Sequence, residues 1–174
     1  MGFHHVALAT RDLEKTHEFY TEVMGFTLVK TVIAPIPGSR EGWSRHVFYD
    51  TGSQGLIAFW DLHDEQWTDG YPTNLNKTAG LPGWVNHFAY LAPTQEFLDE
   101  RRRTWCSHGH VVAEVDHDFC VSIYTNDPDG NTVEFCYDRR PFTDAEKIHA
   151  LELLRAERPA LDKDPSITIH QPTS

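Results

Sequence analysis

Long apolar runs and dense basic runs are both missing from this sequence of 174 residues. No stretch approaches the roughly 18 consecutive apolar residues that a membrane-spanning helix requires. The longest basic run is Arg101–Arg103, and 15 Lys and Arg stand against 26 Asp and Glu, a net charge of −11. A nucleic-acid interface needs basic residues that replace the counterions around phosphates. The composition therefore argues against a membrane protein and against a nucleic-acid-binding protein.

Cysteine is also scarce, with Cys106, Cys120 and Cys136 as the three copies. An odd number without a CxxC pair does not fit a disulfide framework or a structural zinc site. The first residues, Met1–His5, lack the basic and apolar regions of a signal peptide. These features predict a cytoplasmic protein in a reducing compartment.

Most of the chain reads as two halves with the same order of elements, which predicts an α+β fold. Strand-like alternation and helix-like spacing give the order strand, helix and three strands in each half. A polar segment rich in Gly and Pro separates them, and we interpret it as a linker or a loop over a site. We expect a first βαβββ module at 1–62, a linker at 63–83, a second βαβββ module at 84–140, and a C-terminal helix and tail at 141–174.

The C-terminal segment carries a helical pattern of its own. Ile148, Leu151 and Leu154 recur at helical spacing within residues 145–157. This pattern predicts an amphipathic helix that packs either on its own domain or on a second subunit. The tail from Pro159 is polar and interrupted by proline, so we expect it to be mobile or only loosely docked.

Two histidines hold the same position in the two halves. His5-Val-Ala-Leu and His87-Phe-Ala-Tyr correspond to each other within the first strand of each half, 82 residues apart. Glu134 lies in the middle of the last strand of the second half, on the face opposite Val133 and Phe135. A carboxylate among apolar neighbours is costly unless it is paired or binds a metal. We therefore predict that His5, His87 and Glu134 bind a divalent metal as a facial triad with open positions.

Several segments, in this order and spacing, resemble the vicinal oxygen chelate superfamily. The superfamily includes glyoxalase I, bleomycin and fosfomycin resistance proteins, methylmalonyl-CoA epimerase and extradiol dioxygenases. The resemblance covers roughly residues 3–138 and implies paired βαβββ modules that form a curved mixed sheet around a metal-binding cavity. The segments that carry it are His4–Leu8, Asp12–Leu13, Phe19–Tyr20, Gly25–Phe26, His87–Ala89 and Asp127–Phe135.

Within this superfamily, the ligand set resembles that of two branches. The position that matches Glu134 in the first half is about Ala58, which cannot bind a metal. A set of two histidines and one glutamate resembles that of extradiol dioxygenases and fosfomycin-modifying enzymes. Ser122-Ile123-Tyr124 resembles the segment that precedes the ligand strand in ring-cleaving dioxygenases, which implies catalytic roles for Tyr124 and, nearby, His117. The acid–base histidine that this branch usually places near Gln54-Gly55 is missing.

The favoured prediction is an Fe(II)-dependent extradiol-type dioxygenase, an oxidoreductase acting on a catechol-like small molecule with vicinal oxygens. One alternative is a glyoxalase-like lyase or isomerase, or a fosfomycin-type resistance transferase, with Mn(II), Zn(II) or Ni(II). Another is a binding protein of the bleomycin-resistance type without catalysis. The resemblance also implies a homodimer, but the sequence leaves open whether the modules pair within one chain or across two.

Overall fold

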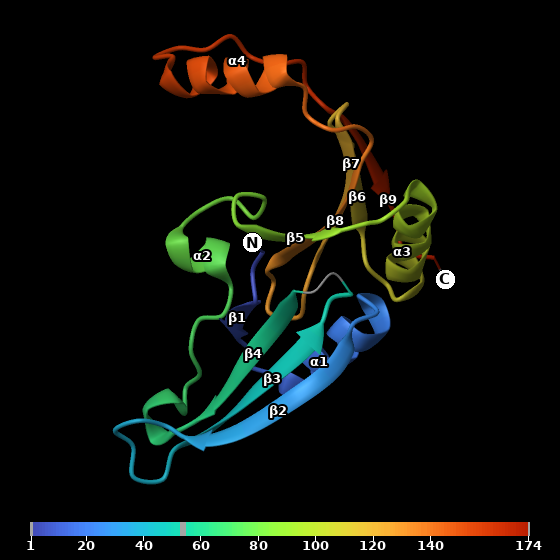
Figure 1. Cartoon of the computed structure of the whole chain (residues 1–174). Coiled ribbons are helices and arrows are strands. Elements are labelled where there is room, and N and C mark those ends of the chain that lie inside the picture. Colours follow the sequence, from blue (N-terminus) through green and yellow to red (C-terminus); the bar gives the residue numbers. More distant parts are fainter. Residues whose placement is uncertain (1, 53–54, 174) are drawn as a thin grey trace.

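The computed structural model describes residues 2–52 and 55–173, and its strands form two separate sheets (Figure 1). The order in the first sheet is β1-β4-β3-β2, and the order in the second is β5-β8-β7-β6-β9. In each sheet the first strand of a module pairs in parallel with its last strand, and the remaining pairs are antiparallel. The predicted α+β class and the two βαβββ modules are confirmed.

The first module follows the predicted order closely. Its strands are β1 (His5–Ala9), β2 (Thr27–Pro35), β3 (Trp43–Asp50) and β4 (Leu56–His63). The predicted single helix between β1 and β2 is in fact two pieces, the α-helix α1 (Leu13–Glu18) and the π-helical turn η1 (Phe19–Val23). Gly25 ends this segment in the left-handed region at φ 78°, where an added Cβ would lie 2.6 Å from the Arg101 guanidinium.

The second module repeats this arrangement and gains an additional strand. Its helix α3 (Gln95–Ser107) begins at Thr94, whose hydroxyl accepts a hydrogen bond from the Phe97 N–H. Its strands are β5 (His87–Leu91), β6 (Val112–Asp116), β7 (Cys120–Asn126) and β8 (Thr132–Asp138). The added strand, β9 (Ser166–His170), pairs antiparallel with β6 from Val112 to Asp116.

Strand β9 corrects the expectation that the tail is mobile or loosely docked. Its backbone completes the ladder of β6, and His170 Nε2 lies 2.8 Å from the Glu114 carboxylate, which also faces Arg102. The expectation failed because the strand that pairs with Ser166–His170 lies far away in the sequence. Pairing with an edge strand 54 residues earlier supplies its hydrogen bonds. The predicted C-terminal helix is present as α4 (Asp144–Arg155).

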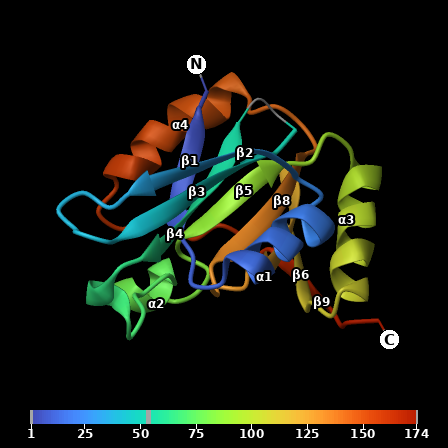
Figure 2. The same ribbon diagram turned by 90° about the horizontal axis from the view of Figure 1, so that it is seen from below.

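The two modules share one hydrophobic core on the side of their helices. The Trp105 indole N–H of α3 donates to the Val23 carbonyl oxygen at 3.1 Å. Phe26 packs against Phe135 of the second sheet, with ring centroids 6.1 Å apart. On the second sheet this core lies beneath α3, while α4 lies on the other side of that sheet (Figures 1 and 2). The opposite faces of the sheets are consequently left for a site.

The segment between the modules is not a plain linker. It contains the 3₁₀ turn η2 (Glu65–Trp67) and the short helix α2 (Leu75–Ala79). The Asn74 side chain donates to the Gly130 carbonyl, and the Leu75 N–H donates to the Asn131 side chain at 2.9 Å. These bonds attach the segment to the turn before β8. No described helix is long and apolar enough to cross a membrane.

Candidate functional site

The strand registers confirm which positions of the two modules are equivalent. Glu134 of β8 lies opposite Ala89, two residues after His87. Ala58 of β4 lies opposite Ala7, two residues after His5. Ala58 is therefore the structural counterpart of Glu134, as the sequence predicted. The first module cannot supply a carboxylate at this place.

His87 and Glu134 form the clearest cluster among the predicted site residues. His87 Nε2 lies 3.2 Å from Glu134 Oε2, because β5 and β8 are parallel neighbours with both side chains on one face. The side chain of Glu134 is 6% exposed and that of His87 is 36% exposed. The other ring nitrogen, Nδ1, lies 3.1 Å from the Trp84 carbonyl oxygen. A histidine oriented in this way through its second nitrogen is typical of metal ligands.

His5 lies apart from this pair in the single chain. Its Nδ1 is 2.8 Å from His4 Nδ1, and its ring lies 5.5 Å from the Phe48 ring and 6.2 Å from the His46 ring, centroid to centroid. Among residues 2–52 and 55–173, no three or more His, Cys, Asp and Glu side chains come together as a metal site. The structure thus brings together two of the three predicted ligands, and the complete triad stays a prediction.

Tyr124 and His117 lie beside the His87–Glu134 pair. Tyr124 of β7 is the register partner of Glu134, and its ring centroid is 6.0 Å from that of His87. His117 Nε2 lies 3.4 Å from the Tyr124 hydroxyl oxygen. Burial, together with the Glu134 carboxylate, raises the pKa of Tyr124 well above its usual value. The phenol therefore stays protonated and can donate a hydrogen bond to a ligand.

On the first sheet, the face of His5 also carries an aromatic group. His46 stacks on Trp60 with ring centroids 3.7 Å apart, and its Nε2 is buried without a hydrogen-bond partner among the described residues. Burial, followed by the charge of His5, lowers the pKa of His46. Phe48 packs against the same imidazole, with ring centroids 4.2 Å apart. Alternation along β3 could have indicated this group, because His46 and Phe48 are two residues apart.

Different places in the fold are taken by the aromatic residues Phe48, Phe59, Trp60, Trp84 and Tyr90. Phe59 is fully buried and Tyr90 contacts Phe26 in the shared core, so neither lines the site. Trp84 is exposed next to His87. Only Phe48 and Trp60 lie on the face that carries His5.

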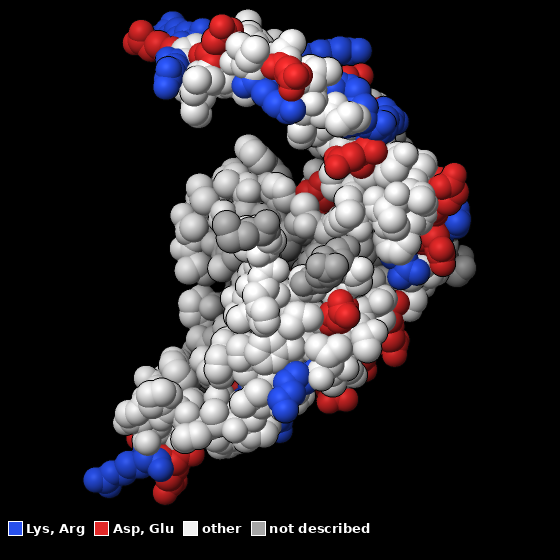
Figure 3. All heavy atoms as spheres, in the orientation of Figure 1, with Lys and Arg blue, Asp and Glu red and all other residues white. Residues whose placement is uncertain are grey.

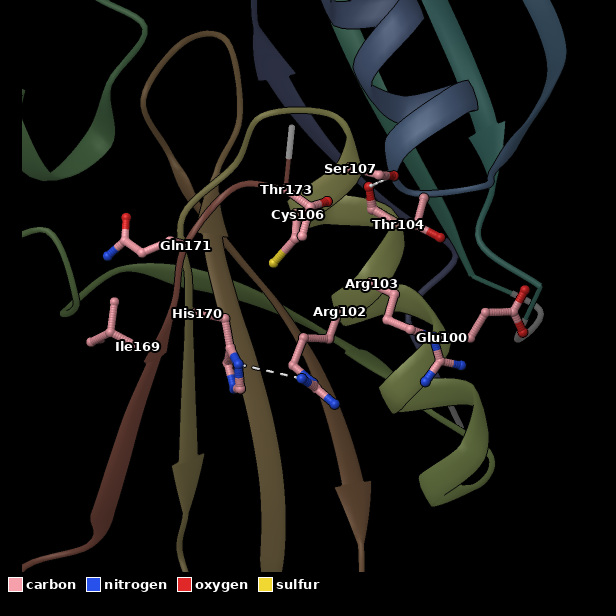
Figure 4. Close-up of a pocket in the computed structure, with 10 residues that line it drawn as sticks. All are labelled: Glu100, Arg102, Arg103, Thr104, Cys106, Ser107, Ile169, His170, Gln171 and Thr173. Atoms are coloured by element: carbon pink, nitrogen blue, oxygen red, sulfur yellow. Dashed lines mark hydrogen bonds between the residues drawn. The ribbon is translucent and has the colours of Figure 1, made fainter.

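A separate open groove of about 680 Å³ lies between α3 and β9 (Figure 4). Across the groove, an Arg102 guanidinium nitrogen lies 3.3 Å from His170 Nδ1, and both side chains also contact the Glu114 carboxylate. These contacts fix β9 to the sheet. None of the predicted site residues lines this groove, so it is distinct from the candidate metal centre.

Residues 2–135 match the family described as Glyoxalase/Bleomycin resistance protein/Dioxygenase superfamily. The chain belongs to this superfamily. The resemblance seen in the sequence is thereby confirmed.

Curated relatives of this superfamily member include two dioxygenases. It is 25% identical over 132 residues to the catechol-2,3-dioxygenase of Bacillus subtilis, covering 76% of this chain and 40% of that protein. It is 28% identical over 138 residues to biphenyl-2,3-diol 1,2-dioxygenase 2 of Rhodococcus globerulus, covering 78% of this chain and 62% of that protein. The chain thus spans about half the length of these relatives.

A solved structure supports the fold alone. A glyoxylase/bleomycin resistance protein/dioxygenase domain from Frankia sp. EAN1pec has a TM-score of 0.58 and 19% sequence identity, covering 80% of this chain and 98% of that one. Members of the superfamily typically bind a divalent metal and a small molecule. The His87–Glu134 pair is chemically suited to such a metal.

Proposed function

We propose that this chain is an Fe(II)-dependent extradiol-type dioxygenase that cleaves the ring of a catechol-like substrate. The observation that carries the proposal is the pairing of His87 with the nearly buried Glu134 at 3.2 Å, beside Tyr124. Two relatives whose names describe dioxygenases of dihydroxylated aromatic rings point to the same chemistry. Both relatives share no more than 28% identity with this chain and are longer than it, so the reaction is proposed here and not transferred from them.

The residues present fit a divalent metal. Glu134 is an anionic oxygen donor held in a largely buried place, where a carboxylate needs a cation or another partner. His87 supplies a neutral nitrogen donor, and two such histidines with one carboxylate suit non-haem iron and leave positions free for substrate. When bound, Fe(II) lowers the pKa of the substrate hydroxyls and orients dioxygen beside the ring.

We propose further that the third ligand, His5, comes from a second copy of the chain. Within the described chain His5 does not join the other two ligands. It is exposed on an open sheet face, and His87 is exposed on the other sheet. A twofold dimer that places the first sheet of one copy over the second sheet of the other would form two identical sites. In this proposal the homodimer expected from the resemblance is needed to complete the ligand set.

The chain's own residues have defined tasks in this proposal. The Tyr124 hydroxyl donates a hydrogen bond to the bound substrate, because its raised pKa keeps it protonated. His117, 3.4 Å from that hydroxyl, exchanges a proton with it. His46, Phe48 and Trp60 provide an aromatic wall that excludes water and packs against a flat ring.

The proposal is tested with protein loaded anaerobically with Fe(II), Mn(II), Zn(II) or Ni(II). We expect oxygen uptake and a yellow ring-cleavage product from a catechol panel with Fe(II), and loss of both in Glu134→Gln. Absence of oxygen uptake with every catechol, despite stoichiometric iron, would overturn the dioxygenase assignment. Turnover of a hemithioacetal or an epoxide with Mn(II), Zn(II) or Ni(II) would instead assign the glyoxalase-like or fosfomycin-type chemistry.

A binding protein without catalysis gives a different result. Its affinity for an aromatic ligand would be the same in Glu134→Gln as in the unchanged protein, because the metal would not take part. Titration of both proteins with a non-oxidisable catechol analogue separates these cases.

A further inference from the structure

Helix α4 projects from the body of the molecule as an arm (Figure 1). Its start is firmly fixed: the Thr143 hydroxyl accepts from the Glu146 N–H, and the Glu146 carboxylate accepts from the Thr143 N–H. Arg140 bridges to Glu146 at 2.9 Å, and Phe142 packs on Phe119 with ring centroids 5.2 Å apart. Strand β9 holds the chain again after the helix. The N-terminal end of the arm is therefore anchored to the second module.

The arm presents an apolar side that residues 2–52 and 55–173 of its own chain leave exposed. Ile148 is 68% exposed, Leu151 is 48% exposed and Leu154 is 81% exposed. No described strand or helix packs extensively against α4. An isolated helix of 12 residues is marginal in water, and helices of this length depend on packing of an apolar side. The exposed apolar side of α4 therefore indicates that another surface packs against it.

The arm lies on the same side of the second sheet as the candidate metal centre. Phe135 of β8 points to α3, where its ring lies 5.6 Å from Trp105, so its neighbour Glu134 points to the opposite side. Helix α4 is on this opposite side, away from α3 (Figures 1 and 2). In Figure 3 the arm stands free of the body, with charges of both signs along it. A body that covered Glu134 and His87 would therefore meet α4.

We infer that the apolar side of α4 packs on the first sheet of a second copy, the copy that supplies His5. This inference rests on the proposed function, since it uses the same twofold dimer. The first sheet offers an apolar contact for the arm at its edge, because Val32 of the edge strand β2 is exposed. Val32 is the register partner of His46, so it lies on the face that carries His5. Each copy gives one arm and receives one, as a closed twofold interface requires.

The inference is tested with the double variant Ile148→Glu and Leu151→Glu in the full chain. Glutamate has a helix propensity at least as high as isoleucine, so the helix itself is retained. We expect a dimer for the unchanged protein and a dimer dissociation constant raised by at least about 100-fold in the double variant, from burial of two charges. Sedimentation velocity gives the constant, and circular dichroism checks that the variant folds.

The matched control is His149→Glu, which places the same charge on another side of the helix. We expect it to leave the dimer unchanged. Hydrogen exchange of residues 144–155 should slow as protein concentration rises, because dimer formation covers the arm. A dimer of equal strength in the double variant, or a monomer at every concentration, would overturn the inference. A monomer with a protected α4 would mean that the arm folds onto its own chain, which would also overturn it.

Failure of the proposed function gives a different pattern. In that case His87→Ala would bind Fe(II) as tightly as the unchanged protein, while the double variant would still weaken the dimer. The opposite result is weaker Fe(II) binding in His87→Ala with an unchanged dimer in the double variant. It would overturn the role of the arm and leave the proposed function in place.

Discussion

The two modules share the order and pairing of their strands but differ in chemistry. Both begin with a strand that carries a histidine at its start and pair it with their last strand in the same register. At the equivalent position, however, the second module has Glu134 and the first has Ala58. The difference teaches that the repeat fixes equivalent positions in the two modules, while single residues decide which module carries a carboxylate there.

The modules differ also in how they are covered. The second sheet gains β9 along its edge, whereas the edge strand β2 of the first sheet is exposed over most of its length. Turns before the last strands differ as well: Asp127 is buried, while the matching Asp50 is exposed. The first module is consequently the part with more surface left for contact with another molecule.

The largest expected effect comes from removing the carboxylate that distinguishes the second module. Glu134→Gln should lower Fe(II) affinity by at least about 100-fold, since even a residue behind a ligand changes metal affinity by 10–100-fold. Isothermal titration under anaerobic conditions measures this. Glu14→Gln, at an exposed position on α1, serves as the control. Unchanged affinity in Glu134→Gln would remove Glu134 from the metal site.

Giving the first module the residue of the second tests whether the two positions are interchangeable. Ala58 is fully buried, so Ala58→Glu should destabilise the metal-free protein by about 3 kcal/mol through an unpaired buried charge. Added metal should recover part of this loss if the carboxylate reaches His5. Ala58→Gln has the same size without the charge. Equal losses in both variants, measured by urea unfolding, would attribute the effect to volume alone.

The buried Asp127 should make stability depend on pH in a way that Asp50 does not. Burial, opposed by the hydrogen bond from Asn131, raises the pKa of Asp127 from 3.8 to about 6. The folded protein therefore holds this proton more tightly than the unfolded chain, and stability falls as pH rises from about 4 to about 6. The loss is at most about 3 kcal/mol.

Urea unfolding between pH 4 and pH 7 measures this effect. Asp127→Asn should remove this part of the pH dependence, because asparagine does not ionise. Asp50→Asn should leave it in place, because Asp50 is exposed, and among the described residues its carboxylate accepts a hydrogen bond only from the nearby Gly52 N–H. The same pH profile in the unchanged protein and in Asp127→Asn would contradict the role of this carboxyl group.

The smallest expected effect concerns the join between the modules. Trp105→Phe removes the hydrogen bond to the Val23 carbonyl and part of the shared core. We expect a loss of about 2 kcal/mol, from an unpaired buried carbonyl and a small cavity. Both modules should still unfold in one transition by fluorescence and circular dichroism. Two separated transitions would show that the modules fold independently.

Much of this fold was predictable because it depends on local patterns. Alternation in Thr132–Cys136 put Glu134 on the face opposite Val133 and Phe135, and the structure confirms it. The π-helical turn at Phe19–Val23 was not predicted, since its side-chain spacing is close to that of an α-helix. The docking of residues 73–75 on the turn before β8 likewise depends on hydrogen bonds between segments distant in sequence.

The candidate site was likewise predictable only where it depends on patterns within the modules and on their repeat. The sequence pointed to His87 because it matches His5 in the repeat, and to Glu134 because it is a carboxylate in the middle of an apolar strand. The sequence could not show that His46 joins an aromatic group, because this depends on stacking with Trp60 across β3 and β4. Where His5 lies relative to His87 depends on how two modules are arranged, which no pattern within either module determines.

The sequence by itself determined the order of elements, the faces of the strands and the asymmetry between Ala58 and Glu134. These follow from a period of two residues in strands and from the repeat, which are properties of neighbouring residues. Only the tertiary structure decided that β9 completes the second sheet, that α4 stands out as an arm, and that His5 is kept apart from its two predicted partners. Such outcomes depend on which distant surfaces meet, and they are fixed by long-range packing and hydrogen bonding.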